Sequence, residues 1–132
     1  MKSYLTTFVL IVFAIFAFSK SSYAGAHSSK GTTLILGAVP WEMTAVLDEV
    51  TEKEPGILHN IPYTQGKLYG MPVIVALTGV SKTNTGMVTG ALIAAFDPTR
   101  VVLSGTGARV KPEIKAGSVF IIEETTFHDS GN

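Results

Sequence analysis

A short run of apolar, β-branched residues at Thr32–Val39 is the feature that most restricts how this chain can fold. The run, TTLILGAV, shows no alternation of apolar and polar residues, which is typical of a strand buried on both faces, as in a parallel sheet. A second run of this kind, RVVLS, occupies Arg100–Ser104. The two runs indicate an α/β domain.

The segments between and after these runs predict helices and a hairpin. Pro40 stands at a natural first helical position, Glu54-Pro55-Gly56 is expected to end that helix, and Asp97-Pro98 is expected to end a second one. The order indicates an α/β fold with a mixed central sheet flanked by helices. The expected elements are strand 32–39, helix 41–52, strands 61–68 and 71–78 joined by Tyr69-Gly70, helix 82–96, and strands 100–104 and 118–125.

The N-terminus has the three parts of a secretory signal peptide. Lys2 is followed by the almost wholly apolar run Tyr4–Phe18, and small residues precede Ala24. Cleavage after Ala26 fits equally well. A transmembrane anchor is the alternative, but the run is short for a span of about 20 apolar residues. We therefore expect a signal peptide at 1–24, a flexible lead-in at 25–32, and a periplasmic or secreted protein with no membrane attachment after cleavage.

The charge balance and composition exclude several classes of partner and cofactor. The formal net charge is zero, and cleavage after Ala24 would remove Lys2 and Lys20, leaving more acids than bases. Nucleic-acid binding needs clustered positive charge, so we expect no nucleic-acid partner. No His, Asp or Glu spacing suggests a metal site, and no cofactor is expected. The absence of cysteine fits an exported protein that does not rely on disulfides.

Candidate chemistry lies where the two buried runs end. Gly37 and the turn Gly105-Thr106-Gly107 follow strands, and open α/β sheets bind ligands at that edge. Neither turn is a nucleotide-binding fingerprint, so each could be only a tight turn. Glu42 lies in the first turn of the predicted helix. It could be a carboxylate favoured by the helix dipole, or a general base at the ligand edge. His128-Asp129 could be a site pair or the end of a loop.

Six segments, in order along the chain, resemble motifs of the 5′-methylthioadenosine/S-adenosylhomocysteine nucleosidases, in the purine nucleoside phosphorylase/nucleosidase superfamily. The resemblance covers nearly all of 33–129. The segments, with the family patterns, are 36–42 (LGAVPWE; G-A-M-x-x-E), 63–70 (YTQGKLYG; G-x-L-x-G), 78–84 (TGVSKTN; S-G-x-G-K-x-x-A), 104–108 (SGTGA; T-G-S-A-G), 115–119 (KAGSV; L-x-x-G-D-x-V) and 127–129 (FHD; Y-H-D).

The chain departs from these patterns at several positions. Ser81 replaces the usual second glycine, and Ser118 stands where aspartate is common. Ala108-Arg109 stands where two glycines are common, and Val39 replaces a methionine that lies near the ribose. The departures suggest a divergent branch of the family.

The resemblance implies cleavage of the N-ribosidic bond of a purine nucleoside, such as 5′-methylthioadenosine or S-adenosylhomocysteine. That reaction needs one group to protonate the leaving purine and another to activate water. By position, Glu42 is the expected water-activating base. Thr106 takes the place of a hydroxyl residue near the ribose and the water, Val39 lies near the ribose, and Gly107 and Ala108 form part of the backbone wall beside the base.

The resemblance also implies that residues 33–132 are the N-terminal half of the domain. In the family, the purine-protonating aspartate and the ribose-binding glutamate come from the C-terminal half. We therefore expect the full-length form to be the enzyme and the chain alone to be inactive. A homodimer is a further expectation from the family.

Two other functions remain open. Phosphorolysis needs cationic donors for phosphate, usually arginines, and only Arg109 lies near the second glycine turn. This pattern favours water over phosphate, unless Arg109 reaches back to the site. Export is unusual for an enzyme of intracellular nucleosides, which motivates a non-catalytic nucleoside-binding or storage protein as the second alternative.

Overall fold

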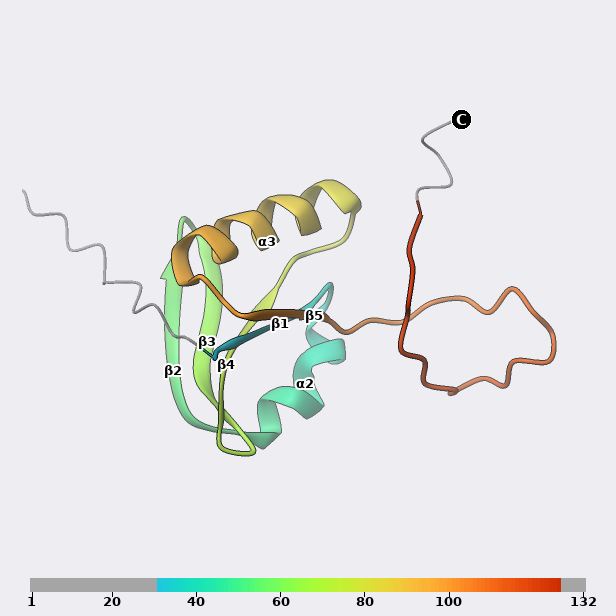
Figure 1. Ribbon diagram of the computed structural model, residues 1–132, viewed down its shortest axis with the longest axis horizontal. Helices are drawn as coiled ribbons and strands as arrows, with labels where there is room; N and C mark the ends of the chain where they lie inside the picture. Colours follow the sequence, from blue (N-terminus) through green and yellow to red (C-terminus); the bar gives the residue numbers. More distant parts are fainter. Residues whose placement is uncertain (1–30, 127–132) are drawn as a thin grey trace, which may run out of the picture.

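The computed structural model describes residues 31–126 and places the two apolar runs next to each other in a five-stranded mixed sheet (Figure 1). The second run, predicted to be buried, is exposed over Arg100–Leu103, because no described strand lies beyond it at this edge of the sheet. The strand order is β2-β3-β4-β1-β5. The predicted signal peptide and His128-Asp129 lie outside the described residues. The elements are β1 (Thr33–Gly37), α2 (Pro40–Glu49), β2 (Val50–Leu58), β3 (Ile61–Leu68), β4 (Met71–Leu77), α3 (Lys82–Phe96) and β5 (Arg100–Leu103).

β1 lies between β4 and β5 and is parallel to both. Leu34 and Leu36 pack on one face with Leu92 of α3, whereas Ile35 packs on the other face with Met43 of α2. Figure 1 shows these helices on opposite sides of the sheet. Because β1 is covered on both faces, both sets of its side chains must be apolar, which explains the lack of alternation.

The first helix is shorter than its sequence predicts. α2 ends at Glu49, and Glu54-Pro55-Gly56 lies inside β2 instead of ending the helix. β2 is an edge strand that pairs only with β3 among the described strands, and an edge position tolerates proline. An irregularity between Thr51 and Glu54, with Glu52 at φ 53°, interrupts the ladder. The expected helix terminator is therefore part of a bulged edge strand.

The strand predicted over 118–125 is absent. After β5, residues 104–126 contain no helix or strand, and nearly all of them are exposed. A strand needs a hydrogen-bonding neighbour, and no described strand lies beyond β5 to provide one. The segment has the composition of a strand, but composition alone does not form one without a neighbouring strand to pair with.

The other predicted elements are confirmed. The hairpin β3–β4 turns at Tyr69-Gly70, whose φ values of 50° and 80° suit the left-handed turns that hairpins prefer. α3 has the predicted bounds, and the Asp97 residue that caps its C-terminus has a left-handed conformation. The mixed central sheet flanked by helices is thus the fold that the sequence predicts. Within residues 31–126, neither helix is long and apolar enough to cross a membrane.

We predict opposite effects for two glycine-to-alanine changes. At Gly66, an added Cβ would lie 2.6 Å from the Thr51 carbonyl oxygen and against a Val50 methyl group, so the bulge must move. Gly66→Ala should lower the free energy of unfolding by about 1–3 kcal/mol. At Gly90, in α3, the added methyl meets nothing within 4 Å. Gly90→Ala should raise this free energy by about 0.5–1 kcal/mol. Urea denaturation measures the free energy of unfolding of both variants. Equal changes in the two would contradict the close packing described around Gly66.

Candidate functional site

The carboxyl ends of β1, β4 and β5 meet at one edge of the sheet. Beyond the strands, the N–H of Thr78 donates to the Gly37 carbonyl at 2.8 Å, and the N–H of Ser104 donates to the Leu36 carbonyl at 2.8 Å. These bonds continue the parallel ladder by one step on each side of β1. As a result, the turns that follow β1 and β5 start at the same level, on the edge where open α/β sheets bind ligands.

Glu42 joins these two turns with its side chain. Its Oε1 accepts hydrogen bonds from the N–H and the hydroxyl of Thr106, both at 3.1 Å. Its Oε2 accepts from the N–H of Ala38 at 2.8 Å and from the N–H of Val39 at 3.3 Å. The structure therefore brings together Glu42, Thr106 and Val39, three of the residues predicted from the sequence.

The hydrogen bonds hold Glu42 in its ionised form. The backbone N–H of Ala38 contributes most to lowering the pKa of Glu42 below its ordinary value of 4.5, and Thr106 and Val39 lower it further. Partial burial acts in the opposite direction but does not outweigh them. Glu42 also lies in the first turn of α2, where the helix dipole favours a negative charge. The carboxylate is therefore an anion at neutral pH.

Gly107 and Ala108 are exposed in the segment that follows Thr106. Among the described residues, no hydrogen bond joins either of them to Glu42, and an added Cβ at Gly107 would meet nothing within 4 Å. Gly105 lies closer, because a Cβ there would be 3.7 Å from Glu42 Oε1. Gly107 and Ala108 therefore lie outside the Glu42–Thr106 hydrogen-bonded group, and their expected place beside the base stays a prediction.

Thr78 is a residue of this edge that the sequence analysis did not select. It is buried, and its hydroxyl donates to the Gly79 carbonyl at 2.9 Å and lies 3.4 Å from the Gly37 carbonyl. The hydroxyl of Thr85 in α3 donates to it at 3.3 Å. A polar residue at the end of the apolar run VIVALT was the available signal. Thr78 ties the start of α3 to the turn that carries Glu42.

Ser81 holds an unusual backbone conformation at the start of α3. Its φ of 107° lies in a region that is nearly restricted to glycine, and its side chain accepts a hydrogen bond from the Asn84 N–H. The nucleosidase pattern places glycine here. The chain therefore keeps a glycine-like backbone with a capping hydroxyl added.

Arg109 does not reach back to the Glu42–Thr106 group. One guanidinium nitrogen donates to the Ile114 carbonyl at 2.9 Å and to the Pro112 carbonyl at 3.5 Å. Arg109 thus closes its own loop. Within residues 31–126, no group of three or more His, Asp or Glu side chains could hold a metal ion.

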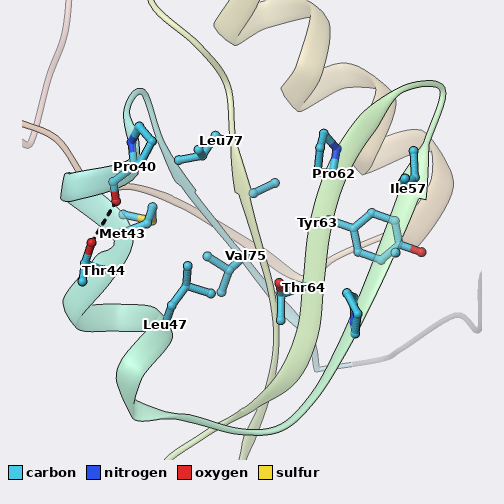
Figure 2. A pocket seen from close by; sticks show the side chains of 13 residues that line it. Pro40, Met43, Thr44, Leu47, Ile57, Pro62, Tyr63, Thr64, Val75 and Leu77 are labelled. Atoms are coloured by element: carbon cyan, nitrogen blue, oxygen red, sulfur yellow. Dashed lines mark hydrogen bonds between the residues drawn. The ribbon is translucent and has the colours of Figure 1, made fainter.

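An apolar groove of about 790 Å³ lies between α2 and the strands β2, β3 and β4 (Figure 2). Met43 and Leu47 line it from the helix, and Tyr63 and Val75 from the sheet. Glu42 is not part of its lining, and no carboxylate or histidine is. The groove offers apolar contact but no acid–base group, and the Glu42 carboxylate lies outside it.

Comparison with known proteins matches the chain to one family model and to relatives that are named as nucleosidases. Residues 32–132 match the family model described as "Phosphorylase superfamily". A 5′-methylthioadenosine/S-adenosylhomocysteine nucleosidase of Geobacillus sp. (strain WCH70) is 32% identical over 95 residues, which are 72% of this chain and 41% of that protein. The chain therefore spans about two fifths of the length of the curated relatives that it matches.

Two solved structures from Helicobacter pylori share the fold. The first is a mutant nucleosidase with 5′-methylthioadenosine in its active site, with a TM-score of 0.60 and 26% identity, covering 64% of this chain and 37% of that chain. The second is a futalosine hydrolase mutant, with a TM-score of 0.57 and 27% identity, covering 64% and 39%. Each is therefore similar to about two thirds of this chain.

We predict that Glu42 makes stability depend on pH. Because its pKa is lowered on folding, Glu42 stabilises the fold above pH 4.5, and this contribution is lost as the pH falls through the folded pKa. Glu42→Gln should therefore lower the midpoint of thermal unfolding most at pH 7, and the difference from wild type should shrink below pH 4.5. Glu49→Gln, on the same helix, is the matched control. A difference that stays constant with pH would contradict the prediction.

Proposed function

Because the chain belongs to the phosphorylase superfamily, we propose that the protein carrying it hydrolyses the N-ribosidic bond of a purine nucleoside, with Glu42 as the base that activates water. The observation that carries this proposal is the Glu42–Thr106 hydrogen-bonded group at the ligand edge of the sheet. The relatives named as nucleosidases support the reaction type. The chain spans about two fifths of their length, so the activity is proposed for the whole protein.

The hydrogen bonds of Glu42 suggest how a water molecule could enter. A carboxylate has about four lone-pair positions, and the four hydrogen bonds of Glu42 occupy them. Three of the donors are backbone N–H groups with fixed directions. The Thr106 hydroxyl can rotate, so it is the donor that a water molecule would replace. Once released, this hydroxyl can hold the water or a ribose oxygen.

In the proposed reaction, the water oxygen forms a bond to the anomeric carbon while the bond from that carbon to the purine nitrogen breaks. Glu42 takes a proton from the water, and its anionic form is suited to an oxocarbenium-like centre. The leaving purine must take up a proton on the opposite side. The resemblance implies that an aspartate from the C-terminal half of the domain supplies it.

We propose 5′-methylthioadenosine or S-adenosylhomocysteine as substrates, because these names are carried by the relatives. The similarity to a futalosine hydrolase makes other nucleosides alternative substrates in this proposal. Water is preferred to phosphate as the nucleophile, because Arg109 is bound to carbonyls of its own loop. The predicted signal peptide makes export part of the proposal, and the homodimer stays a prediction.

We predict that Glu42→Gln lowers kcat for purine release by about 10²–10⁴-fold, the usual contribution of a positioned base. The assay follows free purine by chromatography, with 5′-methylthioadenosine and the protein that carries these residues. Glu49→Gln should leave turnover unchanged. Turnover in wild type that needs inorganic phosphate would favour a phosphorylase. Tight nucleoside binding without turnover would favour a binding or storage protein.

We predict that Thr106→Val lowers kcat by about fivefold, in line with a lost hydrogen bond of about 1 kcal/mol, whereas Thr106→Ser keeps most of the activity. The Val variant should also raise the pKa of Glu42, because one of the bonds that lowers it is removed. The acidic limb of the pH profile of kcat/KM, which reports the free enzyme, should therefore move to higher pH. An unchanged limb would show that the hydroxyl does not act on Glu42.

A further inference from the structure

A second pocket, of about 310 Å³, lies at the end of the sheet opposite to the Glu42–Thr106 group. That group lies beyond the carboxyl end of β1, whereas Thr32, which lines the pocket, immediately precedes β1. Residues at the start of β4 and at the end of β3 line it as well. We call it the amino-end pocket, and its polar side chains are those of Thr32, Glu52, Glu54, Gln65 and Lys67.

The strand register places this pocket on the face of the sheet that α3 covers. Gln65 faces Ile74, which belongs to the core cluster formed with α3. Lys67 lies two residues further along β3 and therefore on the same face. Glu54 of β2 is paired with Gln65, and cross-strand partners share a face. Phe96, the last residue of α3, lines the pocket from the helix side.

Thr32 brings a buried hydroxyl group to this pocket. Only 3% of the residue is exposed, and its Oγ1 has no hydrogen-bond partner among residues 31–126. The carbonyl of Thr32, in contrast, accepts from the N–H of Thr99 at 3.0 Å and from the Thr99 hydroxyl at 3.3 Å. Leaving a buried hydroxyl unpaired is unfavourable, so a ligand group that pairs with it gains affinity.

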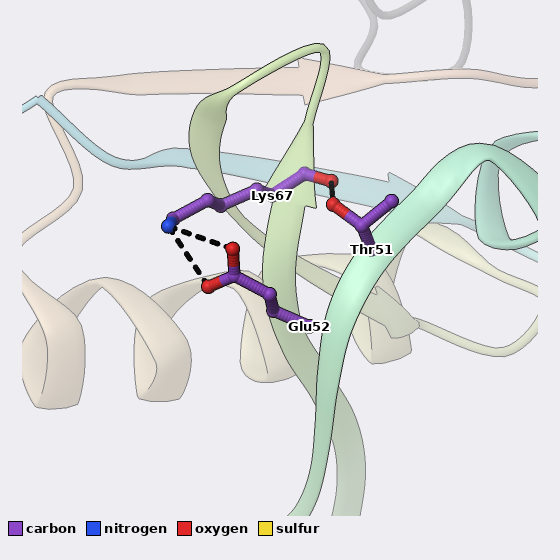
Figure 3. Close-up of polar contacts among 3 residues, drawn as sticks. All are labelled: Thr51, Glu52 and Lys67. Carbon is purple, nitrogen blue, oxygen red and sulfur yellow. Dashed lines mark hydrogen bonds and ion pairs between the residues drawn. The ribbon is translucent and has the colours of Figure 1, made fainter.

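The charged side chains leave one surplus negative charge in the pocket. Lys67 Nζ lies 2.8 Å from a carboxylate oxygen of Glu52, and Figure 3 shows these two side chains reaching toward each other from β3 and β2. The Glu54 carboxylate has no hydrogen bond or ion pair with any residue that the structure describes. The last turn of α3 contains no basic residue to offset the negative end of its dipole. The pocket therefore favours a ligand with one positive charge.

The size and the other walls of the pocket indicate an organic cation. Pro72, Ile74 and Phe96 give it apolar walls, and its volume is at the lower limit of about 300–1,000 Å³ for small-molecule sites. Glu54 and Thr32 are three strand spacings apart in the order β2-β3-β4-β1, roughly 14 Å between backbones at about 4.8 Å per spacing. A ligand that reaches both must be elongated and must carry a polar group at each end.

We propose that the amino-end pocket binds a small linear amino alcohol. Its ammonium group donates to the Glu54 carboxylate, its aliphatic chain contacts Pro72 and Phe96, and its hydroxyl pairs with the Thr32 hydroxyl. The single positive charge balances the surplus carboxylate, and the ligand hydroxyl satisfies the buried group that lacks a partner. This site is separate from the one proposed for the nucleoside and does not depend on that proposal.

Three compounds with the same four-carbon chain test this recognition by NMR titration of the full chain. 4-Amino-1-butanol should bind about fivefold more tightly than 1-aminobutane, the effect of one hydrogen bond to a buried hydroxyl. 4-Hydroxybutanoate, whose charge is reversed, should show no saturable binding. Equal affinities of the two amines would overturn the proposal, and so would the absence of binding by all three compounds.

Thr32→Val tests the hydroxyl end of the pocket. This variant should bind the two amines equally, whereas Thr32→Ser should keep the fivefold preference. Because Thr32→Val removes an unpaired hydroxyl and keeps the side-chain shape, it should unfold at no lower urea concentration than the wild type, which checks that it folds. A preference for the amino alcohol that survives in Thr32→Val would overturn the role of the Thr32 hydroxyl.

Glu54→Gln tests the acidic end. Because Glu54 is exposed, its loss should weaken the binding of both amines by about two- to fivefold, as for a solvent-exposed ion pair. Glu49→Gln is the matched control, since it removes the same charge from α2, outside the pocket lining, and it should change neither affinity. Equal losses in the two variants would reflect net charge alone and would overturn the pairing with Glu54.

Discussion

The structure depends on the burial of β1 between two parallel neighbours and two helices. β4 and β5 pair with it on both sides, while Met43 and Leu92 cover its two faces. Moving either neighbouring strand would leave buried backbone groups unpaired, which is costly. The end of β1 is thereby fixed in space. Only one tight turn separates the end of β1 from Glu42. The position of the strand therefore fixes the position of the carboxylate.

The sequence predicted well those elements whose signal is local. The β1 run, the Tyr69-Gly70 hairpin and α3 are confirmed, because buried strands, left-handed turns and helical spacing each leave a pattern in adjacent residues. β2 was missed. Its Glu54-Pro55-Gly56 has the composition of a terminator, and only pairing with β3 makes it a strand. The predicted strand at 118–125 failed for the complementary reason, since it has the composition but no partner.

The candidate site was predictable in part. Glu42 and Thr106 are 64 residues apart, yet both follow apolar strands, and neighbouring parallel strands bring such ends together. Val39 was predicted as a site residue, but the role of the Ala38 and Val39 N–H groups as donors to Glu42 was not, because every residue except proline carries such a group. Thr78 acts mainly through hydrogen bonds to carbonyls, which composition does not reveal.

The peptide unit between Gly37 and Ala38 has its two ends held by different parts of the molecule. Its carbonyl accepts from Thr78, and its N–H donates to Glu42. Hydrogen bonds in such a chain polarise one another, so a stronger grip on the oxygen makes the N–H a better donor. The backbone of Thr78 is thus connected through one peptide unit to a carboxylate that it does not touch. A shift of the Thr78 backbone would therefore change the strength with which the Ala38 N–H donates to Glu42.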